Sequence, residues 1–384
     1  MTNLVQTRSR IGISGSYGGM NIGDEAILQG ILAELQTSVA AEITVFSKNP
    51  ADTLARHRVE RAVNPRTLTR REAASEVEKL DLLVLGGGGI LYDGEAGHYL
   101  REVAIAHELN VPVAVYAISA GPLATPGSRE AVRETLNGSG ATVITVRDRL
   151  GYRLLEDVGV TREIHLTADP AFLIEPEPAV GALLAEGVHL DRRLVGFSVR
   201  EPGPAAPDID PEEYYGLLAN AADFIVARYD ADIVFVPMEK TDIQHSHQVM
   251  GHMQHAEHAE LLRRRYSPGQ LLYLMGLFDF AVGMRLHFLI FAAHHGTPFT
   301  ALPYASKVIG LLEDLGLETP PLGSFGVGDL VARIDHTFDT RDQVRAQILS
   351  RLPDMKSRAK QTQRLLMTLL GDAMAEPTKG SRPC

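Results

Sequence analysis

Short apolar runs alternate with amphipathic stretches along the whole chain of 384 residues, and this alternation constrains the fold more than any other feature. Strand-length apolar runs separated by helix-length amphipathic stretches are typical of a parallel sheet covered by helices. The first half predicts strands at Ile11–Ser14, Ile43–Phe46, Leu82–Leu85, Val113–Ile118, Thr142–Val146 and Ile164–Leu166. The second half predicts strands at Leu194–Val199, Ile233–Val236, Phe280–Val282 and Phe299–Leu302. The pattern therefore predicts an α/β protein with doubly wound parallel sheets.

The alternation breaks once and then starts again, which indicates two domains. The break is the Pro-rich segment Glu175–Ala179, which has the composition of a linker. Two Rossmann-like domains facing a central cleft are the simplest arrangement, with ligands at the carboxyl ends of the strands. The predicted parts are residues 1–175, residues 180–335, a helical segment at 340–372 that Pro353 interrupts and that packs back on the first domain, and a tail at 375–384.

Composition excludes several classes of protein. The hydrophobic share of 45% and the charged share of 22% are those of an ordinary globular protein. A net charge of −11 argues against nucleic acid as a partner, because phosphate backbones are bound by clustered Lys and Arg. The single cysteine, Cys384, excludes a disulfide framework. Without a secretory signal or an apolar run of ~18–20 residues, we expect a cytoplasmic protein; attachment to the inner face of the membrane and a homo-oligomer stay open.

The first glycine-rich motif, Gly15–Glu25, lies between a predicted strand and a predicted helix. Glycines there allow a ligand to approach backbone N–H groups, and a helix amino terminus favours an anion. The motif matches neither the Rossmann dinucleotide fingerprint nor a Walker A loop. The alternative is a tight turn without a ligand, in which Asp24 caps the helix.

A second glycine run, Gly86–Gly89, follows the predicted strand Leu82–Leu85. It allows close approach either of a ligand or of the neighbouring glycine turn, and a bare strand-to-helix connection is the alternative. Two such loops at strand ends of one domain favour a cleft. We interpret this cleft as the side that binds the acceptor substrate of a transfer reaction, with Tyr92 and Asp93 as groups that bind the hydroxyls of that acceptor.

Arg200 ends the first strand of the second domain. The planar guanidinium suits a carboxylate or a phosphate because it offers two parallel hydrogen bonds. The alternative is an ordinary ion pair with Glu201 or another nearby carboxylate.

The segment Gly283–Lys307 carries the strongest chemical signal. Arg285 and His287 stand at the start of an apolar helix, where the helix amino terminus reinforces anion binding, and Lys307 follows the next strand. Histidine is the natural acid–base group near neutral pH. The combination suits a small dianion that is held tightly and protonated.

Five histidines crowd the stretch from His245 to His258. They lack an H-E-x-x-H pattern, a cysteine partner and a convincing ligand spacing, so we predict no metal site here or elsewhere. We interpret the stretch as a solvated, mobile helix or loop, followed by a helix at Ala256–Arg264.

Taken together, these motifs resemble the polysaccharide pyruvyl transferase family. The motifs, in chain order, are GSYGGMNIGDEAIL, LVLGGGGILYD, VYAISAGPL, VRDRLGYRLLEDVGV, TADPAFL, GFSVRE and GMRLHFLIFAAHHGTPFTALPYASK. The resemblance covers roughly Ile11 to Gly316. It implies two Rossmann-like domains like those of B-type glycosyltransferases, phosphoenolpyruvate as donor, and no nucleotide or other cofactor.

The resemblance also implies roles for the residues. His287 would be the general acid, assisted by Arg285, while Arg200, Arg285 and Lys307 would bind phosphoenolpyruvate. The acceptor, a saccharide or a lipid-linked saccharide of a cell-surface or exopolysaccharide, would enter from the glycine loops. The predicted acceptor residues are Gly18, Gly19, Asn21, Asp24, Gly88, Gly89, Tyr92 and Asp93.

Two other functions stay open at this point. A B-type glycosyltransferase would use the same fold, with Arg285 and Lys307 neutralising a nucleotide diphosphate; Glu313 is the nearby acidic candidate for the ribose. A non-catalytic phosphometabolite-binding protein would keep the cleft without the chemistry. The sequence does not specify the acceptor sugar or which hydroxyls the ketal joins.

Overall fold

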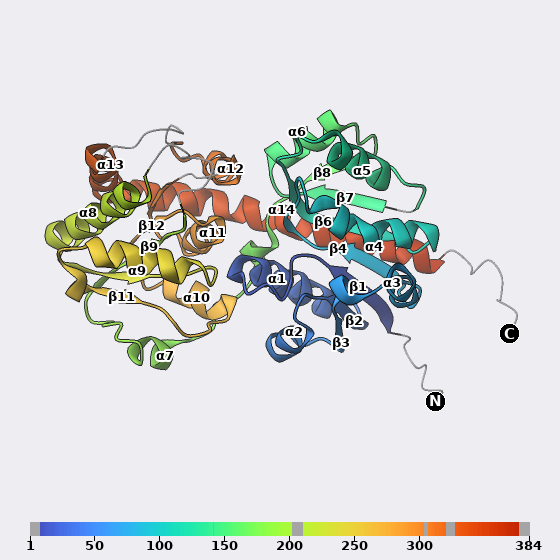
Figure 1. Ribbon diagram of the computed structural model, residues 1–384, viewed down its shortest axis with the longest axis horizontal. Helices are drawn as coiled ribbons and strands as arrows, with labels where there is room; N and C mark the ends of the chain where they lie inside the picture. Colours follow the sequence, from blue (N-terminus) through green and yellow to red (C-terminus); the bar gives the residue numbers. More distant parts are fainter. Residues whose placement is uncertain (1–7, 141, 202–209, 303–305, 320–326, 376–384) are drawn as a thin grey trace, which may run out of the picture. The chain divides into compact units, whose positions relative to one another are not determined.

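The computed structural model describes residues 8–140, 142–201, 210–302, 306–319 and 327–375. The chain forms two compact units. Unit 1 comprises Met1–Gly19, Ile27–Leu173 and Met355–Cys384, and unit 2 comprises Met20–Ala26 and Ile174–Asp354. Helices α1 (Ile22–Ser38) and α14 (Arg341–Ala375) each contribute residues to both units (Figure 1).

Unit 1 contains a parallel sheet. Its strands are β1 (Ser9–Ser14), β2 (Ala41–Phe46), β3 (Arg61–Val63), β4 (Leu82–Leu85), β5 (Gly88–Leu91), β6 (Val113–Ala120), β7 (Thr142–Val146) and β8 (Ile164–Leu166). Within the described residues these eight strands follow the order β3-β2-β1-β4-β6-β7-β8, with β5 paired to β6. The chain winds outward from β1 to β3 and then returns to β4 on the other side of β1. The winding therefore reverses between β1 and β4.

Apolar side chains cover both faces of this sheet, which explains why its strands read as continuous apolar runs. The other helices of the unit are α2 (Pro50–Arg56), η1 (Pro65–Thr67), α3 (Arg70–Val77), α4 (Ala96–Glu108), α5 (Pro126–Leu136), α6 (Arg149–Val158) and η2 (Pro170–Leu173). Successive residues of β4 point to opposite faces: Leu83 packs with residues of α3 to α6. Leu82 packs on the other face, where Ile27 of α1 and Leu366 of α14 also lie.

Unit 2 contains a five-stranded parallel sheet among its described residues, in the order β11-β10-β9-β12-β13. These strands are β9 (Arg193–Ser198), β10 (Ala231–Phe235), β11 (Ala259–Leu261), β12 (Phe280–Gly283) and β13 (Phe299–Ala301). The helices are α7 (Val180–Leu184), α8 (Pro211–Tyr229), α9 (Asp242–His252), η4 (Ala256–His258), α10 (Pro268–Met275), α11 (Leu286–His295), α12 (Ser306–Leu315) and α13 (Val327–Asp339). The winding reverses between β9 and β12.

Local signals set several of these boundaries. The carboxylate of Asp210 accepts hydrogen bonds from the backbone of Glu212 and Glu213 and so begins α8. Ser267 and Gln270 form a capping box at the start of α10. Gly296, with φ of 68°, ends α11 in the left-handed conformation that glycine adopts without strain.

The predicted helix at Ala256–Arg264 is wrong. A short 3₁₀ turn is followed there by β11, in which Ala259 and Leu261 are buried and lie opposite Ile233 and Phe235 of β10. Pairing with a neighbouring strand outweighs the local helical pattern.

Two further expectations about chain organisation differ from the structure. Helix α14 continues through Pro353 rather than being interrupted by it; buried residues on either side, Ile348 and Met355, keep both halves packed. Residues 20–26, predicted as part of the first domain, are grouped with unit 2, where the Ile22 amide donates to the Met238 carbonyl at 2.8 Å. The predicted tail beyond Ala375 lies outside the described residues.

Along the part of the chain that the structure describes, no helix combines the length and the apolar character needed to cross a membrane.

Candidate functional site

The carboxyl ends of β9 and β12, where the winding of unit 2 reverses, carry two of the predicted cations. Ser198 of β9 lies opposite Gly283 of β12 in the parallel register. Arg200 and Arg285 each follow two residues beyond that pair, so the register brings them to the same edge of the sheet. Ligands of open α/β sheets bind at the carboxyl ends of the strands beside such a reversal. The arginines therefore emerge where a ligand is expected.

Arg285 is held by two carboxylates. It occupies the N-cap position of α11 and is only 9% exposed. Its Nε donates to Asp242 Oδ2 at 3.0 Å, and its Nη2 also pairs with Asp242. The same Nη2 lies 2.9 Å from Oε2 of Glu239. The guanidinium is thus ion-paired within its own unit.

Asp242 is a fixed part of this arrangement. It is fully buried at the start of α9, and its Oδ2 accepts hydrogen bonds from the backbone of Met238 and Glu239, both at 3.1 Å. Burial raises the pKa of Asp242 above its ordinary value, while the hydrogen bonds and charge of Arg285 act in the opposite direction. The sequence prediction missed both carboxylates; the signal was two acidic residues in the segment that follows an apolar strand.

Arg200 forms the ion pair with Glu201 that the sequence left open as an alternative. The hydroxyl of Tyr214 donates to the Arg200 carbonyl at 3.0 Å and also contacts the sulfur of Met284. Tyr214 therefore connects the end of β9 to the end of β12. The role of Arg200 in donor binding stays a prediction.

His245, from the His-rich stretch, joins this cluster. It lies in α9, with Nδ1 at 2.7 Å from the Tyr215 hydroxyl and Nε2 at 3.8 Å from Oε2 of Glu201. Burial lowers the pKa of His245, Asp242 raises it, and the arginines Arg285 and Arg200 lower it. The pKa of His245 therefore lies below its ordinary value, with burial as the largest cause. The prediction of a helix holds for this part of the stretch, but His245 is partly buried rather than solvated.

His287 lies in the first turn of α11 and contacts the start of α1. A Cβ placed on Gly23 would overlap Nδ1 of the His287 ring. Gly23 belongs to the residues of α1 that are grouped with unit 2. Glycine at position 23 therefore leaves room for the imidazole in its present place, where any Cβ would displace the ring.

Lys307 lies in the first turn of α12, beyond β13. In the sheet, Ala301 of β13 is opposite Gly283 of β12. The lysine thus follows the strand adjacent to the one that precedes Arg285. Residues 303–305 lie outside the described ranges, and the proximity of Lys307 to the arginines stays a prediction.

The glycine loops of unit 1 follow β1 and β4, the strands between which its winding reverses. Tyr17, fully buried, fills the space between them: a Cβ on Gly15 would lie 2.7 Å from its ring, and one on Gly86 would overlap its hydroxyl. Gly18 has φ of +72°, and its Cβ would lie 2.6 Å from the Asn49 amide. Close packing of the chain on itself explains these three glycines.

Asn21 and Asp24, predicted to bind the acceptor, lie at the start of α1. Asn21 Oδ1 accepts hydrogen bonds from the amides of Gly23 at 2.9 Å and Asp24 at 3.3 Å. Asn21 is therefore the side chain that caps the helix, not Asp24 as the alternative interpretation expected. Asp24 lies in the first turn and is partly exposed.

The other predicted acceptor residues differ in their surroundings. Gly88 and Gly89 belong to strand β5 rather than to a loop, and a Cβ on Gly89, like one on the exposed Gly19, would meet nothing closer than 3.8 Å. Tyr92 is 38% exposed. Asp93 instead accepts hydrogen bonds from the Thr125 hydroxyl and the Ala124 amide, both at 2.7 Å. These bonds lower the pKa of Asp93 to about 2. Its carboxylate organises the loop before α5.

The described ranges contain no group of three His, Cys, Asp or Glu side chains arranged to hold a metal ion.

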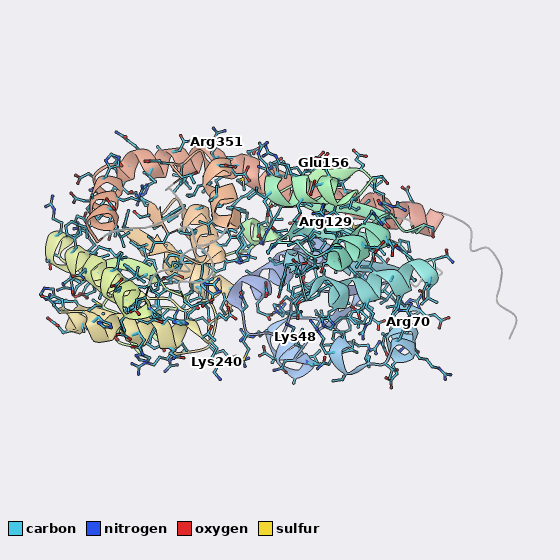
Figure 2. All side chains as sticks on the ribbon, turned by 45° about the horizontal axis from the view of Figure 1, so that its top comes forward. Lys48, Arg70, Arg129, Glu156, Lys240 and Arg351 are labelled. Atoms are coloured by element: carbon cyan, nitrogen blue, oxygen red, sulfur yellow. The ribbon has the colours of Figure 1, made fainter. Side chains whose placement is uncertain are left out.

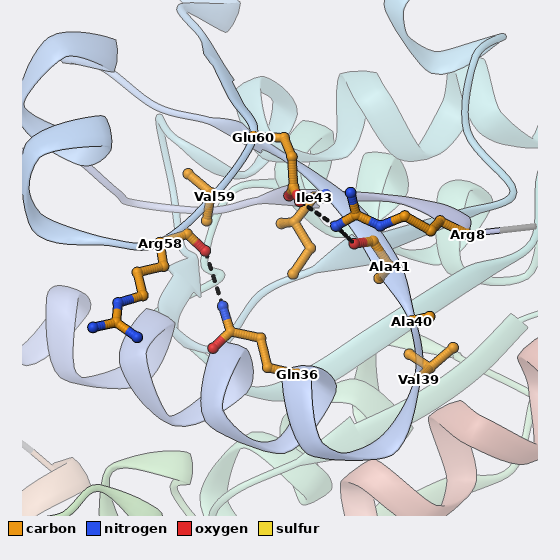
Figure 3. A pocket seen from close by; sticks show the side chains of 9 residues that line it. All are labelled: Arg8, Gln36, Val39, Ala40, Ala41, Ile43, Arg58, Val59 and Glu60. Atoms are coloured by element: carbon orange, nitrogen blue, oxygen red, sulfur yellow. Dashed lines mark hydrogen bonds and ion pairs between the residues drawn. The ribbon is translucent and has the colours of Figure 1, made fainter. Parts of the chain in front are cut away.

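A hollow in unit 1 lies apart from this cluster of charges. It is lined by Arg8, Gln36, Val39, Ala40, Ala41, Ile43, Arg58, Val59 and Glu60 (Figure 3). It lies at the amino ends of β1 and β2, the edge of the sheet opposite the glycine loops, and includes none of the predicted site residues.

Solved structures with the same fold define the class of protein. A putative UDP-N-acetylglucosamine 2-epimerase from Listeria monocytogenes superimposes with a TM-score of 0.65 at 11% identity, over 98% of this chain and 100% of the other. The glycosyltransferase SnogD from Streptomyces nogalater gives 0.53 at 16% identity, over 94% and 100% of the two chains. The fold is therefore that of two Rossmann-like domains, as in B-type glycosyltransferases.

The sequence assigns the chain to one family within this class. Residues 21–306 match the polysaccharide pyruvyl transferase family, and the chain belongs to it. The amylovoran biosynthesis protein AmsJ of Erwinia amylovora is 19% identical over 295 residues, which are 72% of this chain and 70% of that protein. The protein is thus a transferase that acts on polysaccharide.

Proposed function

We propose that this protein transfers the pyruvyl group of phosphoenolpyruvate to two hydroxyls of a saccharide, forming a ketal and releasing phosphate. The observation that carries the proposal is the pair of arginines at the reversal of unit 2, with His287 two residues beyond Arg285. Membership of the family supports it, as does a relative named for amylovoran biosynthesis. The acceptor is a saccharide or lipid-linked saccharide of a cell-surface polymer.

The reaction balances without an oxidant or a metal. A proton adds to the methylene carbon of phosphoenolpyruvate, and the first sugar hydroxyl attacks the neighbouring carbon, which has oxocarbenium character. The bond to phosphate breaks, and a second hydroxyl attacks the same carbon to close the ketal. Of the two hydroxyl protons, one ends on the new methyl group and the other on phosphate. We therefore propose phosphoenolpyruvate as co-substrate and no further cofactor, so that EDTA leaves turnover unchanged.

The residue roles follow from charge and position. His287 is the general acid that protonates the methylene carbon, because imidazole is effective near neutral pH. Arg200 and Arg285 bind the carboxylate and the phosphate, and Lys307 stabilises the departing phosphate. On the acceptor side, Gly19, Gly89 and Tyr92 are the candidates whose surroundings leave them accessible.

The test is to measure binding and turnover separately. Wild-type protein is titrated calorimetrically with phosphoenolpyruvate, UDP and GDP, and phosphate release is followed with a panel of saccharides carrying 4,6- or 3,4-diols. Mass spectrometry identifies the ketal. We expect His287→Gln to keep phosphoenolpyruvate binding but to lose about 10²–10⁴ in turnover, and Lys307→Met to weaken both.

The control is His252→Gln, because His252 pairs with the exposed Glu212 on the surface of the same unit. Binding of UDP or GDP without binding of phosphoenolpyruvate would contradict the proposal and favour a nucleotide-sugar glycosyltransferase. A third outcome is that the wild type binds phosphoenolpyruvate but turns over no acceptor, and that His287→Gln behaves like the wild type. This outcome would favour a phosphometabolite-binding protein.

A further inference from the structure

The two carboxylates on Arg285 differ in how firmly they are held. Asp242 is fully buried and receives hydrogen bonds from two backbone amides as well as from Arg285. Moving it away would leave these donors and the guanidinium without their acceptor, which is costly in a buried site. Glu239, in contrast, is 36% exposed and reaches the guanidinium through an ion pair with Nη2. Because water reaches the carboxylate of Glu239, this ion pair is held less firmly than the buried pair with Asp242.

The charges at this place are unbalanced. One guanidinium faces two carboxylates. The amino terminus of α11 and the neighbouring Arg200 also favour an anion there. Glu239 lies on the turn between β10 and α9, next to Lys240, which Figure 2 labels. Unlike the backbone-anchored Asp242, it can leave by a side-chain rotation into solvent.

We propose that the carboxylate of Glu239 pairs with the Arg285 guanidinium at the position where the donor binds. An anionic group of the donor then replaces this carboxylate, while Asp242 keeps the guanidinium oriented. The exchange replaces one ion pair with another, so Glu239 competes with the donor and weakens its binding. Asp242 and Glu239 are thus a positioning residue and an internal competitor at the same arginine. This inference rests on the proposed function for the identity of the donor, but the competition applies to any anion at this place.

Arg200 shows a similar arrangement. Its ion-pair partner, Glu201, has a side chain 41% exposed, comparable to that of Glu239. The two arginines follow paired positions of adjacent strands, so a ligand with both a carboxylate and a phosphate has two guanidinium groups to engage. Three carboxylates, Asp242, Glu239 and Glu201, thus pair with the two arginines, and the two partly exposed ones are the glutamates.

The test compares Glu239→Gln with the wild type in calorimetric titrations with phosphoenolpyruvate and, separately, with inorganic phosphate. Glutamine keeps the size of the side chain and removes its charge. We expect the dissociation constant of Glu239→Gln for phosphoenolpyruvate to be lower by roughly twofold to fivefold, because the competing ion pair of a partly exposed carboxylate is lost. The matched control is Glu257→Gln, which removes one exposed charge at the other edge of the same sheet, before β11.

Each outcome decides between the two proposals. Tighter binding of phosphoenolpyruvate by Glu239→Gln, with Glu257→Gln unchanged, supports the exchange. Unchanged or weaker binding by Glu239→Gln overturns it, since Glu239 then does not compete with the ligand. If no variant binds phosphoenolpyruvate but Glu239→Gln binds phosphate more tightly, the donor assignment fails and the exchange stands. If no variant binds either anion, both proposals fail.

Discussion

The two sheets reverse their winding in the same way but use the resulting edge differently. In unit 1 the reversal lies between β1 and β4, and the glycine loops that follow these strands close around the buried ring of Tyr17. In unit 2 the reversal lies between β9 and β12, and Arg200 and Arg285, with their carboxylates, lie two residues beyond the ends of these strands. The same topological position is filled by packing in one unit and by charge in the other.

The difference shows that a glycine-rich turn after a strand is weak evidence of a ligand by itself. Gly15 and Gly86 are explained by the tyrosine between them, with no ligand required. A buried arginine is costly unless its charge is paired, and at the edge of unit 2 Asp242 and Glu239 supply that pairing for Arg285. Four variants sharpen this comparison.

The largest effect is expected from Asp242→Ala in unit 2. It removes the buried acceptor of Arg285 and leaves the guanidinium without its fixed partner, which costs about 3–5 kcal/mol of the free energy of unfolding. Urea denaturation measures this change. The control is Glu201→Ala, which removes a partly exposed partner of Arg200 and costs about 0–1 kcal/mol. Equal losses in the two variants would show that Arg285 does not depend on Asp242.

Gly23→Ala is expected to affect turnover rather than stability. The new Cβ overlaps the His287 ring, and the ring can shift because it is a side chain. A misplaced general acid costs about 10²-fold in turnover. Alanine meanwhile favours the helix, so the thermal midpoint changes little. Gly216→Ala is the control: its Cβ meets nothing within 4 Å, on a helix of the same unit. Full activity in Gly23→Ala would contradict the assigned role of His287.

Gly86→Ala tests the packing of unit 1. Its Cβ overlaps the hydroxyl of Tyr17, which is fully buried, and such overpacking costs about 1–3 kcal/mol of the free energy of unfolding. Gly89→Ala, with open space at its Cβ, leaves stability nearly unchanged. Tyr17→Phe combined with Gly86→Ala recovers part of the loss, because the overlapping oxygen is removed. Stability equal to that of the wild type in Gly86→Ala alone would refute this explanation of the glycine.

The smallest effect concerns pH. The hydrogen bonds from Thr125 and Ala124 lower the pKa of Asp93 from 3.8 to about 2. A lowered pKa in the folded state contributes stability above pH 3.8 that is lost as the pH falls toward 2. The difference in thermal midpoint between wild type and Asp93→Asn should therefore be constant near neutral pH and shrink between these two values. A difference that does not vary with pH would show that the carboxylate charge is not involved.

The strands predicted from apolar runs all form, three of them with the predicted bounds and the others with ends that differ by one or two residues. Leu82–Leu85, Thr142–Val146 and Ile164–Leu166 have the predicted bounds, because short apolar runs flanked by polar segments indicate strands directly. Strand β5, at Gly88–Leu91, was not predicted, since two of its residues are glycines that disfavour a strand locally. Strand β11 was predicted as a helix because its pairing with β10 is not visible in the local pattern.

The sequence alone determined the α/β class, the winding of the chain into parallel sheets and the position of Arg285 and His287 at the start of a helix. These features depend on residues close together in the chain, so periodicity and caps reveal them. Only the tertiary structure decided that Asp242 and Glu239 hold Arg285, that Gly23 makes room for His287 and that Tyr17 fills the glycine loops. Each of these contacts joins segments that lie far apart in the sequence, so no local pattern reveals it; the contacts of Arg285 and of Tyr17 form at the edge where strands of one sheet end.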